Sequence, residues 1–427
     1  MANEELMDNT QTVCGECGKA VPLISGYMPW CECGWNLHLS GSHTPKGLVS
    51  RIYRRIGLRR GKVVFEKLLR SQNLPREVDL TNLILLLLSA SVQFFTLFSL
   101  AFGVYFIFNS YSNLLLIFPG LGLLGFAWVA RPRFANVPSD ALSQKEFPEI
   151  HRTVSRVAQA LGTSPPDYIV VNEEFNASVF YVGHFQRKAI SIGLPLFSIL
   201  SGQEKIALIS HELAHFVNGD PTRGVLISLT TRTLVEWHRA LCPDCFLPRN
   251  ESGILLMAAE FVSNVFFYLL SRIPHVLLRG FLHLAWDKAQ TAEYLADRIG
   301  AKVSGTDAFV SMSEKTLLEP KISMAIQRAT LKKDSVGAIN EIQAEVEKIH
   351  PREFDRLKRI AELEEVRLDA THPPTAWRIK LLLANEILNP KLTLATEEEQ
   401  ALTEELNLLE NFVDRKLADC YLRNVYY

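Results

Sequence analysis

The sequence predicts an α+β fold that is mostly helical and contains a small β-sheet, preceded by an N-terminal cysteine-rich unit and a two-helix transmembrane hairpin. Three observations predict this fold: two apolar stretches without charge, three short runs of β-branched and aromatic residues, and long segments with helical spacing. The 427 residues leave room for two or three structural units. The formal net charge of −1 gives no general attraction to a polyanionic partner.

The N-terminal unit, residues 1–45, carries two pairs of cysteines, and each pair is followed by glycine. The stretches "CGECG" and "WCECGW" supply Cys14, Cys17, Cys31 and Cys33. Paired cysteines on two tight turns can close tetrahedrally on one zinc ion, and so small a unit has little core without a metal. We therefore expect a structural zinc site that resembles zinc ribbons, and a protein partner for this unit. Because only Glu32 separates the second pair, His38 or His43 stays open as a substitute ligand, and free or redox cysteines are the alternative.

A basic juxtamembrane segment, residues 46–79, follows the cysteine-rich unit. It holds ten Lys and Arg residues against three acidic ones. Next to a membrane span, the anionic lipid surface is the expected partner of such a segment. Few aromatic residues interleave with the arginines, so nucleic acid is not an expected partner.

Residues 80–130 predict a transmembrane hairpin. Residues 83–108 and 114–130 carry no charge, and a five-residue polar link joins them. About 20 apolar residues span a hydrocarbon core, and the alternative is a pair of buried core helices. Basic residues flank the hairpin on both sides, while its turn carries none. The positive-inside rule therefore predicts an integral membrane protein with both termini and the following domain in the cytoplasm.

The remaining chain predicts three strands and many helices. Residues 167–171, 177–182 and 188–193 are short and rich in β-branched or aromatic residues, which is typical of strands. Residues 306–369 and 394–420 are rich in Glu, Lys, Leu and Ala with helical spacing. They predict packed helices with solvated charged faces.

The stretch "SHELAHFVNGDP", residues 210–221, predicts a metal-binding helix. Ser201 and Glu204 form a capping-box pattern that begins the helix ahead of His211 and His215. Two imidazoles one turn apart on a rigid helix suit zinc. Glu212 is turned about 100° from His211, so it is placed to reach a metal-bound water as a general base. The alternative is a buried helix with two hydrogen-bonded histidines.

The stretch "TAEYLAD", residues 291–297, offers the third ligand. Glu293 can bind zinc, while Asp297, one turn later, can accept the second ring N–H of a ligating histidine. An exposed acidic face is the alternative. The apolar residues Tyr294 and Leu295 between the two carboxylates favour a buried site instead.

Three motifs, "HELAHFVNGD", "EYLAD" and "THPPTAWRI", together resemble the HtpX and CAAX prenyl protease family of membrane-associated zinc metallopeptidases over roughly residues 145–385. The resemblance implies a zincin-like metallopeptidase domain over residues 131–427. It implies a catalytic zinc on His211, His215 and Glu293, with Glu212 as the base and Asp297 behind a ligand. It further implies that His372 and Arg378 face the site, where His372 stabilises the oxyanion or orients substrate, and that Asn176 and Ala177 begin a strand for an extended substrate. A rigid turn is the alternative for the stretch around His372.

Another apolar run, residues 254–271, lies between the histidine helix and Glu293. Since His215 and Glu293 must meet on one metal, they must lie on one side of the membrane. A return crossing through residues 273–290 would bury several charged side chains. We therefore expect no crossing here, and a pair of helices that is buried or lies in the membrane interface.

These observations predict a membrane-anchored zinc endopeptidase that faces the cytoplasm and acts on protein or peptide substrates. Unfolded or membrane proteins, and hence quality control, are the expected substrate class. One alternative is a catalytically silent membrane scaffold that acts through its zinc ribbon. Another is a membrane-tethered nucleic-acid binder.

Overall fold

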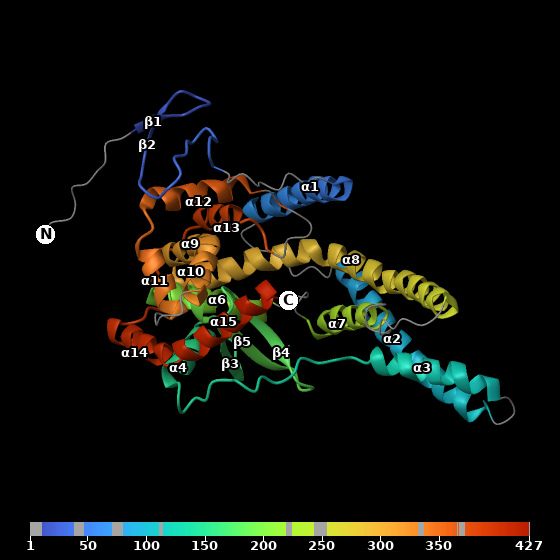
Figure 1. The fold of residues 1–427 in the computed structure, drawn as a ribbon. Helices are drawn as coiled ribbons and strands as arrows, with labels where there is room; N and C mark the ends of the chain where they lie inside the picture. Colours follow the sequence, from blue (N-terminus) through green and yellow to red (C-terminus); the bar gives the residue numbers. More distant parts are fainter. Residues whose placement is uncertain are drawn as a thin grey trace.

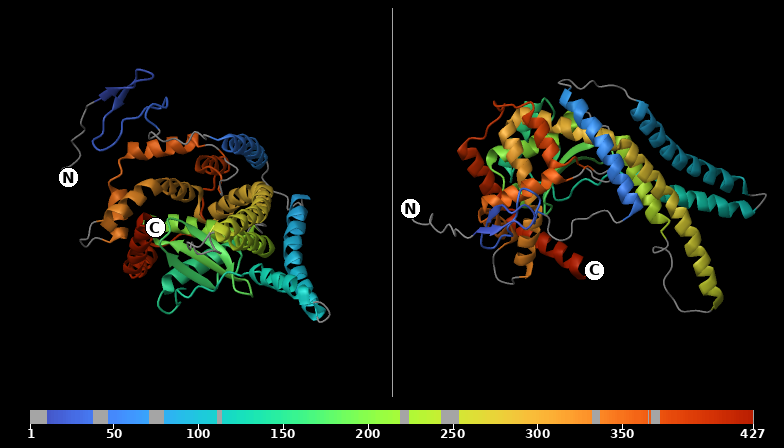
Figure 2. Two further views of the ribbon diagram at one scale, coloured as in Figure 1. Left: turned by 45° about the vertical axis from the view of Figure 1, so that its right-hand side comes forward. Right: turned by 90° about the horizontal axis from the view of Figure 1, so that it is seen from above.

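The computed structural model describes residues 11–37, 47–70, 80–110, 114–218, 224–242, 254–331, 337–364, 366 and 372–426. The chain forms a helical body with two small sheets, from which several apolar helices extend to one side (Figures 1 and 2). His38 and His43, the substitute ligands considered for the N-terminal unit, lie outside the described residues.

The N-terminal unit is a short antiparallel ribbon. Strand β1 (Gln11–Val13) pairs with β2 (Ala20–Pro22), and Thr12 lies opposite Val21. Val21 is buried against Cys14 and Cys31, so the cysteines form the centre of the unit. The unit packs on helix α12 (Pro351–Leu363) of the main body (Figure 1).

The predicted hairpin of two apolar helices is present. Helix α2 (Leu80–Phe108) is long and apolar enough to cross a membrane, and α3 (Ile117–Val129), after the short 3-10 helix η2 (Leu114–Leu116), is a shorter apolar helix. The two helices approach closely at Gly103 and Gly120. A Cβ on Gly103 would lie 3.0 Å from the carbonyl oxygen of Gly120, so a larger side chain would not fit there. Small residues at helix contacts are typical of membrane helix pairs.

The prediction of two helices within residues 254–290 is wrong, because one helix covers the whole stretch. Helix α8 (Ile254–Ser304) runs unbroken for 51 residues and contains Pro274 in its interior. Residues Phe261–Ser304 form the second helix that is long and apolar enough to cross a membrane. The polar residues after 272 have helical spacing, so they continue the same helix beyond its apolar part instead of beginning another one.

Helix α7 (Val225–Ala240) precedes α8 in the chain and lies beside it. It packs against both α8 and α2 (Figure 1). Asn218, at the end of the histidine helix, donates a hydrogen bond to the carbonyl of Ala292 on α8 at 3.0 Å. The chain therefore leaves the body along α7 and returns to the same place along α8.

The three predicted strands are confirmed within one residue at each end. Strands β3 (Tyr168–Asn172), β4 (Ala177–Val182) and β5 (Arg187–Gly193) form one sheet in the order β3-β5-β4, with β3 parallel and β4 antiparallel to β5. Strand β4 therefore lies at an edge of the sheet.

One main core joins the sheet to the helices. Ile190 of β5, Ile206 of α6 (Gly202–Val217) and Phe309 of α9 (Thr306–Lys315) are all fully buried in it. The remaining elements of the body are α4 (Pro148–Leu161), α5 (Leu194–Phe197), η5 (Thr316–Leu318), α10 (Glu319–Leu331), α11 (Ala338–Glu347), α13 (Thr375–Leu383), α14 (Thr396–Asn407) and α15 (Glu410–Tyr426). Helix α1 (Leu48–Arg70) lies alongside α8 (Figure 2).

Candidate active site

The histidine helix α6 begins with the predicted capping box. The Ser201 hydroxyl accepts a hydrogen bond from the Glu204 backbone N–H, and the Glu204 carboxylate accepts one from the Ser201 N–H at 2.7 Å. Lys315 of α9 pairs with the same carboxylate at 2.7 Å. Burial raises the pKa of Glu204, but the hydrogen bonds from Lys315 and Ser311 outweigh it and hold that pKa below its usual value. The start of α6 is therefore fixed against α9.

His211, His215 and Glu293 meet in the interior between α6 and α8. The Nε2 atom of His211 lies 3.6 Å from Glu293 Oε2, and that of His215 lies 3.5 Å from Glu293 Oε1. All three side chains are buried, and their ligand atoms lie within 4.8 Å of one another. Tetrahedral zinc with ligands at about 2.0–2.1 Å places them about 3.3 Å apart. The donor set therefore fits zinc in both chemistry and spacing.

Gly300 allows α8 to come this close to α6, a role that the sequence reasoning missed. A Cβ at this position would lie 3.1 Å from the backbone nitrogen of His211 and 2.9 Å from the Phe309 ring. An isolated glycine inside a helical pattern is a signal of close packing, and it was present in the sequence as "DRIGAK". What the sequence lacked was the partner helix.

Asp297 and Arg378 stand behind His211. Asp297 Oδ1 lies 2.9 Å from His211 Nδ1. Arg378 of α13 holds the same carboxylate with two hydrogen bonds, at 2.8 and 2.6 Å. Burial lowers the pKa of Arg378, but the Asp297 carboxylate raises it by more, so the guanidinium stays charged. A proton on Nδ1 would face the Asp297 carboxylate, which leaves the Nε2 lone pair of His211 directed at the site.

Glu212 and His372 also reach the site. Glu212 is buried, and its Oε1 lies 3.9 Å from His211 Nε2. His372 Nδ1 hydrogen-bonds Glu293 Oε2 at 2.7 Å. The His372 side chain is 45% exposed, whereas that of Glu293 is buried. His372 therefore borders the site from the solvent side.

Asn176 and Ala177 lie where β4 begins. The Asn176 carbonyl accepts a hydrogen bond from the Gly193 N–H at 2.8 Å, and a Cβ on Gly193 would lie 1.7 Å from the Glu174 carbonyl oxygen, so only glycine fits there. The side of β4 away from β5 pairs with no strand in the described part of the chain. Helix α6 packs against β4, with the Tyr181 and Phe216 rings 5.2 Å apart. The structure therefore brings an edge strand of the sheet to the histidine helix.

The four predicted cysteines form a second candidate metal site. Cys14 Sγ lies 3.5 Å from Cys33 Sγ, Cys17 Sγ lies 3.6 Å from Cys31 Sγ, and all four sulfurs lie within 4.8 Å of one another. All four are free thiols. A tetrahedral zinc with Zn–S distances of about 2.3 Å places sulfurs about 3.8 Å apart. The cluster fits zinc although a single residue separates its second pair.

Cys14→Ser should lower the zinc content of the purified protein by about one equivalent per chain, because a serine hydroxyl is a poor substitute for a thiolate ligand. Atomic absorption on the purified variant measures this. Cys420→Ser, at an exposed position on α15, is the matched control and should keep the wild-type content. An unchanged zinc content in Cys14→Ser would contradict the site.

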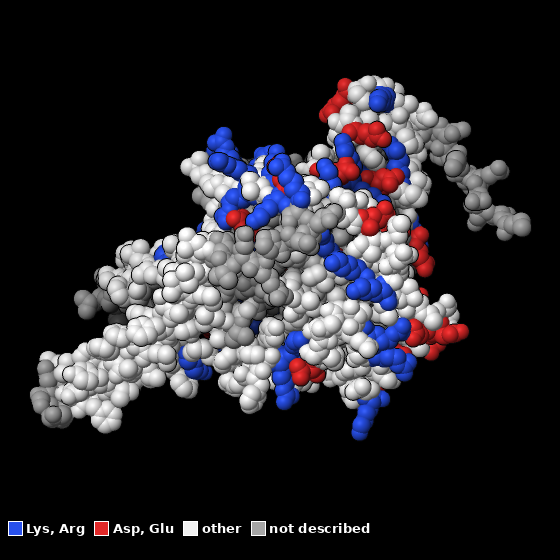
Figure 3. All heavy atoms as spheres, turned by 180° about the vertical axis from the view of Figure 1, so that it is seen from behind, with Lys and Arg blue, Asp and Glu red and all other residues white. Residues whose placement is uncertain are grey.

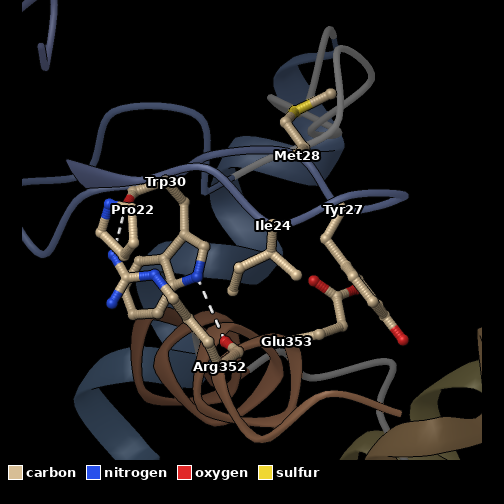
Figure 4. Close-up of a pocket in the computed structure, with 7 residues that line it drawn as sticks. All are labelled: Pro22, Ile24, Tyr27, Met28, Trp30, Arg352 and Glu353. Carbon is tan, nitrogen blue, oxygen red and sulfur yellow. Dashed lines mark hydrogen bonds between the residues drawn. The ribbon is translucent and has the colours of Figure 1, made fainter. Parts of the chain in front are cut away.

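The cysteine unit is attached to the body through α12. Trp30 Nε1 donates to the Arg352 carbonyl at 3.2 Å, and Arg352 Nη2 donates back to the Trp30 carbonyl at 2.9 Å. Figure 4 shows these bonds beside a small pocket lined by Pro22, Ile24, Tyr27, Met28, Trp30, Arg352 and Glu353. Helix α12 packs in turn on α13, the helix of Arg378.

Comparison with known proteins agrees with this geometry. The profile of peptidase family M48 matches residues 144–386, more than half of the chain. A protease HtpX homolog of Pelotomaculum thermopropionicum is 22% identical over 274 residues, which cover 64% of this chain and 88% of the relative. Protease HtpX homologs of Pyrococcus furiosus and Methanopyrus kandleri are each 26% identical over 56% of this chain, covering 74% and 68% of the relatives. No solved structure gives a significant match.

The matched residues contain both histidines of α6 and the carboxylate of α8 that converge on one point. The chain belongs to peptidase family M48 and is an HtpX-like metallopeptidase.

Proposed function

We propose that the protein is a membrane-anchored zinc endopeptidase whose catalytic zinc is held by His211, His215 and Glu293. One observation carries the proposal: three buried ligand atoms from two helices converge within 4.8 Å of one another. Two imidazoles and a carboxylate form the donor set of catalytic zinc sites, which supports a metal at this point.

Zinc bound there would lower the pKa of a water toward neutrality and polarise the carbonyl of the scissile peptide bond. Glu212 accepts a proton from the attacking water and later donates it to the nitrogen of the leaving amine. Asp297 keeps the Nε2 lone pair of His211 directed at the site, and Arg378 holds Asp297 in place. His372, at the solvent side, stabilises the oxyanion or orients the substrate, and its hydrogen bond to Glu293 positions it for this role.

An extended polypeptide is the substrate that this site fits. Strand β4, which follows Asn176 and begins at Ala177, is an edge strand next to the histidine helix, where an extended substrate would add as a further strand. Recognition through the backbone suits unfolded segments of many sequences, which supports a part in the quality control of membrane or misfolded proteins.

Anchoring in a bilayer is supported by the two helices that are long and apolar enough to cross it, α2 and α8. We place residues 80–130 in the membrane as a hairpin, with the apolar part of α8 from Phe261 onward against the same bilayer. By the positive-inside rule, the basic residues of segment 46–79 favour a cytoplasmic position for both termini and for the catalytic domain, within residues 131–427. The unit of residues 1–45 holds one structural zinc and serves as a docking site for a protein partner.

Metal removal tests the proposal. Casein cleavage by the purified protein in detergent should stop after treatment with 1,10-phenanthroline and dialysis, and should return when zinc is added, because Glu212 alone cannot activate water at neutral pH. A catalytically silent scaffold would cleave no casein in any of these states. Full cleavage by protein freed of metal would contradict the zinc mechanism.

A further inference from the structure

The inner face of α1 is fixed along α8. Tyr53 Oη and His283 Nε2 lie 2.9 Å apart, and the Arg60 guanidinium contacts the Asp287 carboxylate at 2.7 and 2.9 Å. Near the other end of α1, Leu68 is fully buried against α8 and α13. The orientation of α1 about its own axis is therefore set, and so is the face that points away from the body.

The outer face of α1 combines cations with exposed aliphatic side chains. Ile52 and Ile56 are 45% and 41% exposed, and Arg51, Arg55 and Arg59 flank them on the same side of the helix. Lys and Arg side chains gather over α1 next to the uncharged apolar helices (Figure 3). A hollow of about 580 Å³ here is lined by Arg55, Ile56, Arg59 and Arg60. A solvated helix face would carry charge without an aliphatic row.

This face lies level with the end of the apolar surface of α8. The large exposed apolar side chains of α8 run from Phe261 to Leu282, and from residue 272 onward the exposed Arg272 and Arg279 lie among them. Tyr53 of α1 contacts His283, the next residue along α8. In a bilayer the level at which an apolar belt ends is the headgroup region, about 5–7 Å thick. The N-terminal half of α1 therefore begins at the depth of lipid phosphates.

We propose that the outer face of the N-terminal half of α1 is a binding site for anionic phospholipid headgroups. Arg55 and Arg59, one turn apart, pair with the headgroup phosphate, while Ile52 and Ile56 enter the boundary of the acyl chains. The inference rests on the membrane anchoring proposed above. Nucleic acid fits this face poorly because the side chains between its cations are aliphatic and offer no stacking surface.

Photocrosslinking of the full chain in nanodiscs tests the inference. Ile56 is replaced by p-benzoylphenylalanine, the nanodiscs contain phosphatidylcholine with a minority of phosphatidylglycerol, and mass spectrometry identifies the lipid attached. Phosphatidylglycerol should be enriched over its bulk share. Arg55→Gln/Arg59→Gln should return the crosslinked share of phosphatidylglycerol toward its bulk share, because each cation removed weakens headgroup binding roughly fivefold. The matched control, Lys67→Gln/Arg70→Gln at the far end of the same helix, should leave it unchanged.

The outcomes separate this inference from the anchoring on which it rests. The same photoreactive residue at Phe266, exposed on the apolar part of α8, should crosslink lipid of either kind. Lipid at position 266 with none at 56, or with bulk lipid proportions at 56, would overturn the headgroup site and leave the anchoring intact. No lipid at either position would overturn both.

Discussion

Glu212→Gln should reduce casein cleavage by about 10³-fold while the zinc content stays at the wild-type value. Glutamine has nearly the same shape as glutamate but cannot accept the proton of the attacking water, and general-base catalysis contributes about 10²- to 10⁴-fold. Glu212 Oε1 lies 3.9 Å from the Nε2 atom of His211. Because glutamine fills the same space as glutamate, the variant keeps the packing around the metal ligands. Initial rates on labelled casein, together with atomic absorption on the same sample, measure both quantities.

The control for this experiment is Glu149→Gln, a change of the same chemistry in an ion pair with the exposed Arg152 on α4. It should cleave casein at the wild-type rate. Cleavage by Glu212→Gln within a few-fold of wild type would remove Glu212 from its role as the base. Loss of zinc in that variant would instead make it a residue of the metal site.

Gly300→Leu should abolish cleavage through packing instead of chemistry. Its Cβ would lie 3.1 Å from the His211 backbone nitrogen, so α8 must move away from α6 and carry Glu293 with it. Overpacking of this kind costs about 1–3 kcal/mol in the free energy of unfolding, and displacement of one ligand should release about one zinc per chain. Thermal unfolding and zinc content measure the two effects.

The same helix supplies a matched control for this substitution. A Cβ on Gly280 would meet nothing within 4 Å, so Gly280→Leu should keep both the zinc content and casein cleavage. Wild-type zinc content and cleavage in Gly300→Leu would show that the contact between α6 and α8 does not hold the site together.

The features that the sequence predicted are those with a local signature. His211 and His215 share one face because the α-helix repeats every 3.6 residues, and the capping box of Ser201 fixes where that helix begins. The strands are recognisable from their composition, and the cysteine pairs from their spacing.

The features that the sequence did not predict depend on contacts between distant segments. The position of Gly300 under His211 joins two helices, and only the assembled fold reveals it. The hydrogen bond of His372 to Glu293 joins residues 79 positions apart. The pairing of α7 with α8 was not predicted. Only residues after the apolar run 254–271 were considered as its helical partner, whereas α7 precedes that run.

The most direct measurement is the position of zinc in an anomalous difference map of the protein collected at the zinc absorption edge. We expect one peak within about 2.2 Å of His211 Nε2, His215 Nε2 and a carboxylate oxygen of Glu293, and a separate peak among the four cysteines. A structure with zinc bound elsewhere in the body, or with the Glu293 carboxylate beyond reach of the metal, would contradict this expectation.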